Sequence, residues 1–212
     1  MKPRILARTV RRALRSFPAV VVTGPRQSGK TTLVRQLLKD SHRYVSLEDP
    51  DTRMRAVEDP RGFLEQVRPP CILDEIQYVP ELLPYLKTEI DERRKAGRWV
   101  LTGSQNFALM RGVSESLAGR AAVLSLLPFS YVERIGRGQS ALNVAALVKR
   151  GRRLVSPSSR RASPGQVLLR GHYPEVASRS SVDKDLWCGS YIASYLERDI
   201  RNLSQVGDLG QF

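Results

Sequence analysis

Residues 24–31 read GPRQSGKT and place two glycines, a lysine and a threonine in the pattern G-x-x-x-x-G-K-[ST]. This spacing is typical of a turn whose backbone N–H groups cradle phosphate oxygens. Glycine lets the backbone approach an anion without a Cβ in the way. Lys30 can reach the phosphates as a mobile charge, and Thr31 can offer its hydroxyl to Mg²⁺. The residues expected to contact a nucleotide are Gly24, Pro25, Arg26, Gln27, Ser28, Gly29, Lys30, Thr31 and Thr32.

An acidic pair, Asp74 and Glu75, ends the short apolar run CIL at residues 71–73. The carboxyl ends of parallel strands line one crevice, so Asp74 is expected beside the phosphate loop. There Asp74 can hold the Mg²⁺ shell, and Glu75 can orient and deprotonate a water for attack on a γ-phosphate. This pair favours hydrolysis over transfer to a bulky substrate. The alternative is an acidic helix cap after an ordinary strand.

Two further positions carry side chains suited to the same chemistry. The run LTGSQN at 101–106 ends a predicted strand, and either Ser104 or Asn106 would face the γ-phosphate or the attacking water. Arg120 precedes the last predicted strand and can neutralise charge on the phosphoryl group, in its own chain or from a neighbouring subunit. The alternatives are an ordinary polar turn at 101–106 and a surface arginine at 120.

Strands alternate with helices along the first two thirds of the chain. Apolar runs rich in β-branched residues predict strands over 19–23, 44–47, 71–73, 98–102 and 121–126. Helical spacing predicts helices over 4–17, 31–39, part of 50–67 and 80–96, with Met54 and Val57 on the apolar face of the third. This alternation predicts an α/β fold, a parallel sheet covered on both faces.

The pattern weakens after Pro128. Residues 150–165 are rich in Arg, Ser, Pro and Gly, and we expect a basic, partly disordered loop region over 134–170. Residues 184–203 return to helical spacing, with Leu186 and Ile192 on one face. We therefore expect a nucleotide-binding core over 1–133, a loop region over 134–170 and a helical C-terminal segment over 171–212.

The formal net charge of +14 is concentrated in two blocks. Nineteen of the 35 Lys and Arg residues lie in 1–39 and 134–174, which contain no acidic residue. Such blocks can bind DNA or another polyanion, or they can be a solvated helix face and a loop. The two cysteines are far apart, and we find neither an 18-residue apolar run nor a secretory signal. A cytoplasmic chain without a membrane contact is the expectation.

Six segments together resemble one family: GPRQSGKTT, YVSLEDPDTR, ILDEIQYVPELLPYLK, LTGSQNFALM, SLAGRAAVLSLLPFSYVE and YLERDI. They are similar to prokaryotic AAA-superfamily P-loop ATPases in which the core precedes a C-terminal domain of unknown function. The resemblance implies a P-loop NTPase three-layer sandwich with a five-stranded parallel sheet in the order 5-1-4-3-2. It also implies that the second domain is missing, because the chain stops near where that domain would begin.

The resemblance also assigns roles to the candidate residues. Lys30 and Thr31 would be the Walker A pair, and Asp74 and Glu75 the Walker B pair. Ser104 or Asn106 would take the sensor-one role. Arg120 would stand at the arginine-finger position.

The function these features favour is a Mg²⁺-dependent ATPase that couples hydrolysis to a conformational change in a partner or homo-oligomer. The N-K-x-D motif that reads guanine is absent from the sequence, which favours ATP over GTP. One alternative is a nucleotide or small-molecule kinase that uses GRRLVSPSSRR at 151–161 as a lid over phosphates. A second is a basic nucleic-acid-binding module without enzymatic activity.

Overall fold

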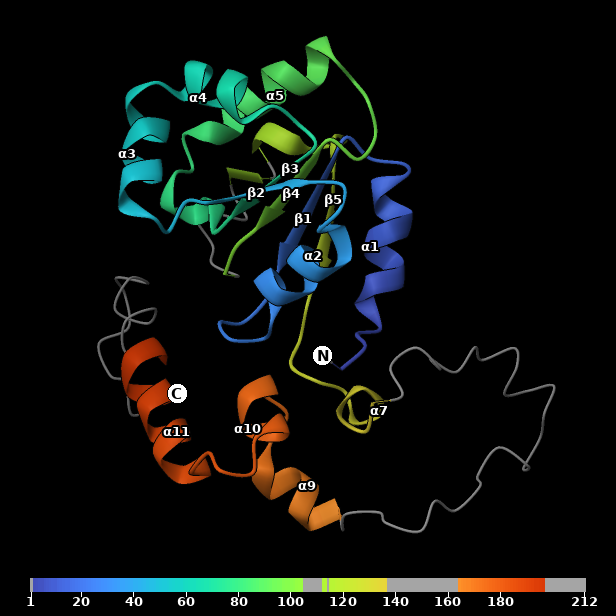
Figure 1. The fold of residues 1–212 in the computed structure, drawn as a ribbon, viewed down its shortest axis with the longest axis vertical. Helices are drawn as coiled ribbons and strands as arrows, with labels where there is room; N and C mark the ends of the chain where they lie inside the picture. The colour runs from blue at the N-terminus through green and yellow to red at the C-terminus, as the bar shows by residue number, and fades with distance from the viewer. Residues whose placement is uncertain (1, 105–111, 114, 137–163, 197–212) are drawn as a thin grey trace, which may run out of the picture.

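A computed structural model describes residues 2–104, 112–113, 115–136 and 164–196. Its centre is a sheet of five parallel strands in the order β2-β3-β4-β1-β5 (Figure 1). This is the predicted order 5-1-4-3-2 counted from the opposite edge, so the predicted fold class is confirmed. The strands are β1 (Ala19–Thr23), β2 (Arg43–Ser46), β3 (Cys71–Asp74), β4 (Trp99–Thr102) and β5 (Ala121–Ser125).

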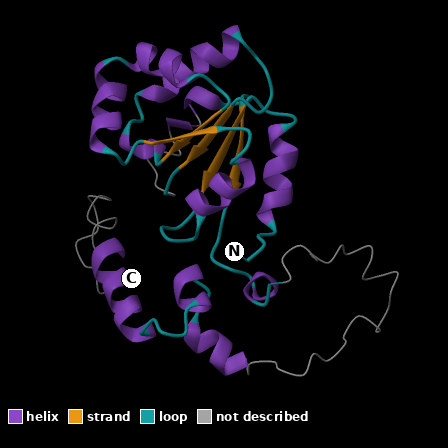
Figure 2. Cartoon of the chain, viewed as in Figure 1, coloured by secondary structure: helices purple, strands orange, loops and turns teal. Residues whose placement is uncertain are grey.

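Helices cover both faces of the sheet and complete three layers (Figure 2). Helices α1 (Leu6–Leu14) and α2 (Lys30–Leu38) pack on one face, where Val10, Leu33 and Val34 join one buried apolar cluster. Helices α3 (Pro50–Glu58), α4 (Pro60–Val67) and α5 (Leu82–Glu92) pack on the other, around Phe63 and Leu86. Both clusters include strand residues, so the sheet is sandwiched between two apolar cores.

Strand β1 lies in the interior of the sheet, between β4 and β5. All five of its residues are buried. Val20 and Val22 join the cluster under α1 and α2, while Ala19 and Val21 join the cluster under α3–α5. This is why the strand is apolar on both sides. The loop that follows β1 therefore lies at the middle of the carboxyl edge of the sheet.

Two aspartates fix where the helices between β2 and β3 begin. The Asp49 carboxylate accepts a hydrogen bond from the Thr52 N–H at 2.8 Å and caps α3, and Asp59 caps α4 in the same way. A proline at the first helical position follows each cap, which is a favoured start signal. The predicted apolar face of this stretch was wrong in part, because Met54 and Val57 are exposed and Ala56 is the buried residue of α3.

The C-terminal elements are short helices below the carboxyl edge of the sheet (Figure 1). They are α7 (Tyr131–Arg134), α9 (Pro164–Arg170), α10 (Pro174–Ser178), α11 (Lys184–Tyr191) and a π-helical turn over Ile192–Leu196. Helix α9 lies inside the range predicted as loop, and its Val167 is buried. Leu186 and Ile192 are exposed, so the face they were predicted to form is not a buried one. No helix in the described ranges is long and apolar enough to cross a membrane.

Candidate functional site

The loop between β1 and α2 has a backbone that only glycine tolerates at two points. Gly24 has a φ of 142°, and a Cβ there would lie 2.2 Å from the Leu126 carbonyl oxygen. Gly29 has a φ of 92° and directly precedes the first residue of α2. Both angles lie in a region that side chains with a Cβ rarely adopt. The two glycines of the motif are therefore required by the shape of this loop.

Polar groups inside the loop are suited to an anion. The Ser28 side chain is buried, and its hydroxyl oxygen has no hydrogen-bond partner. Gly29 offers no side-chain cap to the first N–H groups of α2, and the first turn of that helix contains no acidic residue. Uncapped N–H groups and the positive end of the helix dipole favour a phosphate at this position.

The Lys30 side chain is folded into the loop that precedes it. Its ammonium donates hydrogen bonds to the carbonyls of Gly24 at 3.0 Å and Pro25 at 2.9 Å. Burial lowers the pKa of Lys30, while the carboxylates of Glu75 and Asp74 act in the opposite direction. A bound phosphate would add negative charge beside this buried cation and offset the cost of its burial.

The Asp74 carboxylate, at the end of β3, accepts hydrogen bonds from three hydroxyl groups. Thr31 Oγ1 lies 2.9 and 3.0 Å from its two oxygens, Tyr44 donates at 2.8 Å, and Thr102 donates as well. Burial and the adjacent Asp74 raise the pKa of Tyr44 to about 12, so its hydroxyl remains a donor at neutral pH. The structure thus brings the predicted Walker A threonine into direct contact with the predicted Walker B aspartate.

This oxygen-rich arrangement fits Mg²⁺. No group of three or more His, Cys, Asp or Glu side chains that could hold a metal ion occurs among the described residues. Mg²⁺ does not need one, because it usually keeps several waters and binds through one or two protein oxygens and the substrate phosphates. The Thr31 hydroxyl and the Asp74 carboxylate are donors of that kind.

Glu75 is held by its backbone and by a neighbouring amide. Its φ of 59° is unusual for a residue with a Cβ, and such conformations cluster at functional sites. Its N–H donates to Thr102 Oγ1 at 3.1 Å, and its carboxylate accepts from the Gln77 side chain in the 3-10 turn η1 (Ile76–Tyr78). The carboxylate is therefore oriented beside Asp74 at the carboxyl edge of the sheet.

The remaining predicted site residues are not all near this centre. Ser104 is buried two residues after β4, and Asn106 lies outside the described residues. Arg120 precedes β5 and so lies at the opposite edge of the sheet from the phosphate loop. Its guanidinium pairs with both oxygens of Asp91 at 2.7 and 2.8 Å. The structure does not bring Arg120 to the phosphate loop of its own chain.

Tyr44, Gln77 and Thr102 were not among the residues predicted from the sequence. A polar residue at or next to the end of a buried strand indicates a site residue. From this pattern Ser104 and Asn106 were predicted, and Thr102 was not. Tyr44 carries no such signal, because a tyrosine inside a strand is ordinary. Its ring lies under the Arg35 guanidinium, 4.4 Å from the ring centroid.

Arg4 was also missed, and it connects the N-terminal segment to the phosphate loop. Its buried guanidinium donates to the Ser28 carbonyl at 2.8 Å and pairs with Glu133 at 3.1 Å. Burial alone would raise the pKa of Glu133. Hydrogen bonds from the N–H groups of Ser130 and Ile5, together with Arg4, outweigh burial and lower it. This buried ion pair thus joins the chain before α1 and the chain after β5 to the loop.

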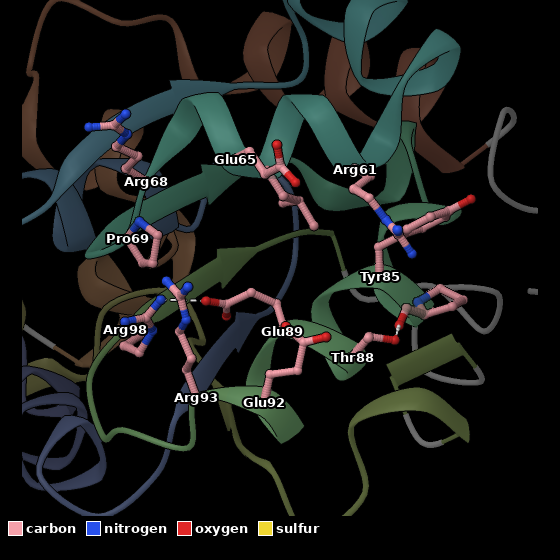
Figure 3. Close-up of a pocket in the computed structure, with 12 residues that line it drawn as sticks. Arg61, Glu65, Arg68, Pro69, Tyr85, Thr88, Glu89, Glu92, Arg93 and Arg98 are labelled. Atoms are coloured by element: carbon pink, nitrogen blue, oxygen red, sulfur yellow. Dashed lines mark hydrogen bonds and ion pairs between the residues drawn. The ribbon is translucent and has the colours of Figure 1, made fainter.

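A separate cleft of about 810 Å³ lies between α4 and α5 (Figure 3). Pro69 and Arg98, which precede β3 and β4, place it at the amino edge of the sheet, away from the phosphate loop. Its wall includes the ion pair of Arg98 with Glu89, and Glu89 also accepts from the Trp99 indole at 2.7 Å. None of the residues that line this cleft belongs to the predicted site.

Residues 16–135, more than half of the chain, match a family described as AAA domain. The chain belongs to this family of AAA-type P-loop ATPases. A second family, described as Domain of unknown function (DUF8612), matches residues 163–212. The expectation that the AAA domain has no second domain after it in this chain is corrected by this match.

Two curated relatives are similar to the AAA protein, and both are described as uncharacterized. It is 33% identical over 199 residues to Uncharacterized protein Rv2008c of Mycobacterium tuberculosis and to Uncharacterized protein Mb2031c of Mycobacterium bovis. The match covers 93% of this chain but 39% of each relative, so the chain spans about two fifths of their length.

Two solved structures are also similar to the AAA protein. The Walker-type ATPase PABY2304 of Pyrococcus abyssi is 17% identical, with a TM-score of 0.42 over 61% of this chain and 54% of that one. AMPPCP-bound DnaA from Aquifex aeolicus is 14% identical, with a TM-score of 0.48 over 95% of this chain and 68% of that one.

Proposed function

We propose that this AAA protein binds ATP with Mg²⁺ at residues 24–32 and hydrolyses it to ADP and phosphate. The observation that carries the proposal is the contact between Thr31 Oγ1 and the Asp74 carboxylate, with Lys30 and Glu75 beside it. A turn that only packed a helix would need the two glycines. It would not need a buried lysine, a threonine and two carboxylates at one edge of the sheet.

The loop residues bind and orient the phosphates. The backbone N–H groups at the start of α2 donate to phosphate oxygens, and Lys30 exchanges its two carbonyl contacts for the β- and γ-phosphates. Thr31 and Asp74 would hold Mg²⁺, which neutralises charge on those phosphates when it is bound. Tyr44 and Thr102 keep the Asp74 carboxylate in place while Thr31 turns toward the ion.

Glu75 acts as the general base. It accepts a proton from a water as that water attacks the γ-phosphorus, and the bond from the γ-phosphorus to the bridging oxygen breaks. Gln77 fixes the carboxylate through its amide. Ser104 or Asn106 would contact the γ-phosphate or this water from the end of β4.

The chemistry is proposed to drive a conformational change in a partner or in a homo-oligomer of this protein. Because Arg120 lies at the far edge of its own sheet, its proposed role as an arginine finger requires a neighbouring subunit. A cytoplasmic location also remains a proposal. So does a DNA or polyanion partner for the two basic blocks, of which Arg8, Arg11 and Arg12 are exposed on α1.

The described residues offer no feature that favours the kinase alternative, since the arginine-rich run at 151–161 lies outside them. Glu75, next to the proposed Mg²⁺ ligand Asp74, is suited to activate a water, and this favours hydrolysis over phosphoryl transfer to another substrate. A protein that only bound nucleic acid through its basic blocks would not need a buried lysine at position 30.

Lys30→Met should lower the affinity for Mg·ATP by about 10-fold or more, because a charge-assisted hydrogen bond contributes on the order of 1.5–3 kcal/mol. Methionine retains most of the buried aliphatic stem. The measurement is titration calorimetry of the wild type and the variant. Lys39→Met is the matched control, since Lys39 is exposed at the end of the same helix and should have no effect. Equal ATP affinity in Lys30→Met and the wild type would contradict the phosphate-loop assignment.

A further inference from the structure

Three aromatic side chains of the C-terminal segment form a cluster beside the phosphate loop. Tyr173 directly precedes α10, and Trp187 and Tyr191 lie one turn apart on α11. The ring centroids are 4.9–5.2 Å apart, and the rings of Trp187 and Tyr191 are stacked with an interplanar angle of 13°. We call these three residues the aromatic platform.

The platform reaches the loop through one hydrogen bond, and the proline next to it also approaches the loop. The Tyr191 hydroxyl lies 3.0 Å from the Tyr173 hydroxyl and donates to the Arg26 carbonyl at 3.5 Å. Pro174, next to Tyr173, lies 3.9 Å from the point where a Cβ on Gly29 would be. Residues far apart in the sequence therefore meet at the loop that is proposed to hold phosphates.

The segment that carries the platform is attached to the core on the same side. The Phe129 N–H donates to the His172 carbonyl at 2.9 Å, and His172 Nδ1 lies 2.7 Å from the Phe129 carbonyl. The Arg134 guanidinium donates to the carbonyls of Val167 and Gly171 at 2.9 and 3.1 Å. These bonds fix the chain immediately before Tyr173.

The rings are not simply the core of a small helical unit. All three are only half-buried, whereas the buried apolar side chains among the described residues of α9–α11 are Val167 and Val176. The large apolar side chains that are exposed in the described part of this segment, Leu168, Leu169, Leu186 and Ile192, do not belong to the platform. The platform therefore leaves aromatic surface accessible beside the loop.

We propose that the aromatic platform binds the nucleobase of the nucleotide whose phosphates occupy residues 24–32. This inference rests on the proposed function. The phosphate loop holds only one end of a nucleotide, and the base at the other end needs a planar apolar surface. Stacking suits any base, since each has a π-face. The segment that matches a domain of unknown function would thus complete the nucleotide site.

The test compares two probes, Mg·ATP and Mg·triphosphate, the inorganic ion that has no base. Because stacking on an aromatic side chain is worth 1–3 kcal/mol per base, Trp187→Leu and Tyr173→Leu should each lower ATP affinity by about 10-fold. Triphosphate affinity should stay within about 2-fold of the wild type. Tyr85→Leu is the control, because Tyr85 is an exposed tyrosine of α5 at the distant cleft and should change neither affinity.

Fluorescence provides a second readout that does not depend on a destabilising substitution. The chain has two tryptophans, and Trp99 is fully buried in β4. ATP should quench the wild-type emission, triphosphate should not, and Trp187→Phe should remove the quenching while it keeps a ring in the platform.

Two results would contradict base binding by the platform: equal losses of affinity for ATP and triphosphate in Trp187→Leu, or equal affinities of the wild type for both probes. Either result would still be consistent with a phosphate site at residues 24–32. A wild-type protein that binds neither probe would overturn the proposed function itself.

Discussion

Glu75→Gln should reduce the turnover of Mg·ATP by about 10²-fold or more while it leaves ATP affinity nearly unchanged. General-base catalysis contributes about 10²–10⁴-fold, and the amide cannot accept the proton of the attacking water. The substitution preserves the volume of the side chain, and the Gln77 amide can still donate to its remaining oxygen. Phosphate release and equilibrium binding should be measured on the same preparations.

Glu81→Gln makes the same chemical change at an exposed position just before α5 and should leave turnover at the wild-type value. Normal turnover by Glu75→Gln would show that Glu75 only begins the turn η1. A loss of binding equal to the loss of turnover would also contradict the assignment, because it would make Glu75 a binding group rather than a base.

Arg120→Ala should lower the turnover of an assembled protein by about 10³-fold, the lower end of what an arginine finger supplies. Since Arg120 lies at the opposite edge of its own sheet from the phosphate loop, this effect requires contact between chains. The specific activity of the wild type should therefore rise with protein concentration, and that of Arg120→Ala should not. ATP affinity should stay nearly the same in both.

Asp91→Asn separates this role from a purely structural one. Arg120 pairs with Asp91 on the protein surface, and exposed ion pairs of this kind contribute little to stability. If Arg120 only ties β5 to α5, both substitutions should have the same small effect on turnover. If Arg120 acts on a neighbouring subunit, Asp91→Asn should retain activity and Arg120→Ala should lose it. Activity independent of concentration and unchanged in Arg120→Ala would contradict the arginine-finger role.

The sheet could be predicted from the sequence because its strands are short apolar runs with sharp ends. The range 19–23 predicted for β1 is the range observed, since every residue of that strand is buried and Pro18 and Gly24 mark its two ends. Strand β2 is more exposed, and its predicted range of 44–47 is one residue too far along the chain. The strand order came from the family resemblance rather than from the patterns.

The contacts of the site depend on tertiary packing, and this limited what the sequence could predict. The loop motif and the Asp74–Glu75 pair were readable because their residues are close together in the chain. Tyr44 and Thr102 reach Asp74 from neighbouring strands, and Arg4 reaches Ser28 from the N-terminal segment. No local pattern marks such residues. The aromatic platform was missed for the same reason, since it becomes visible only when α11 is placed beside residue 26.

Hydrolysis of ATP is tested most directly by measuring the release of phosphate and ADP from ATP by the purified protein with Mg²⁺ and no phosphate acceptor. We expect equal amounts of both products over many turnovers and no release when EDTA removes Mg²⁺. Lys30→Met should decrease the release at least 10-fold at an ATP concentration below the wild-type Kd. Release that is unchanged by EDTA or by Lys30→Met, or no release at all from a wild-type protein shown to bind Mg·ATP, would contradict the proposed hydrolysis.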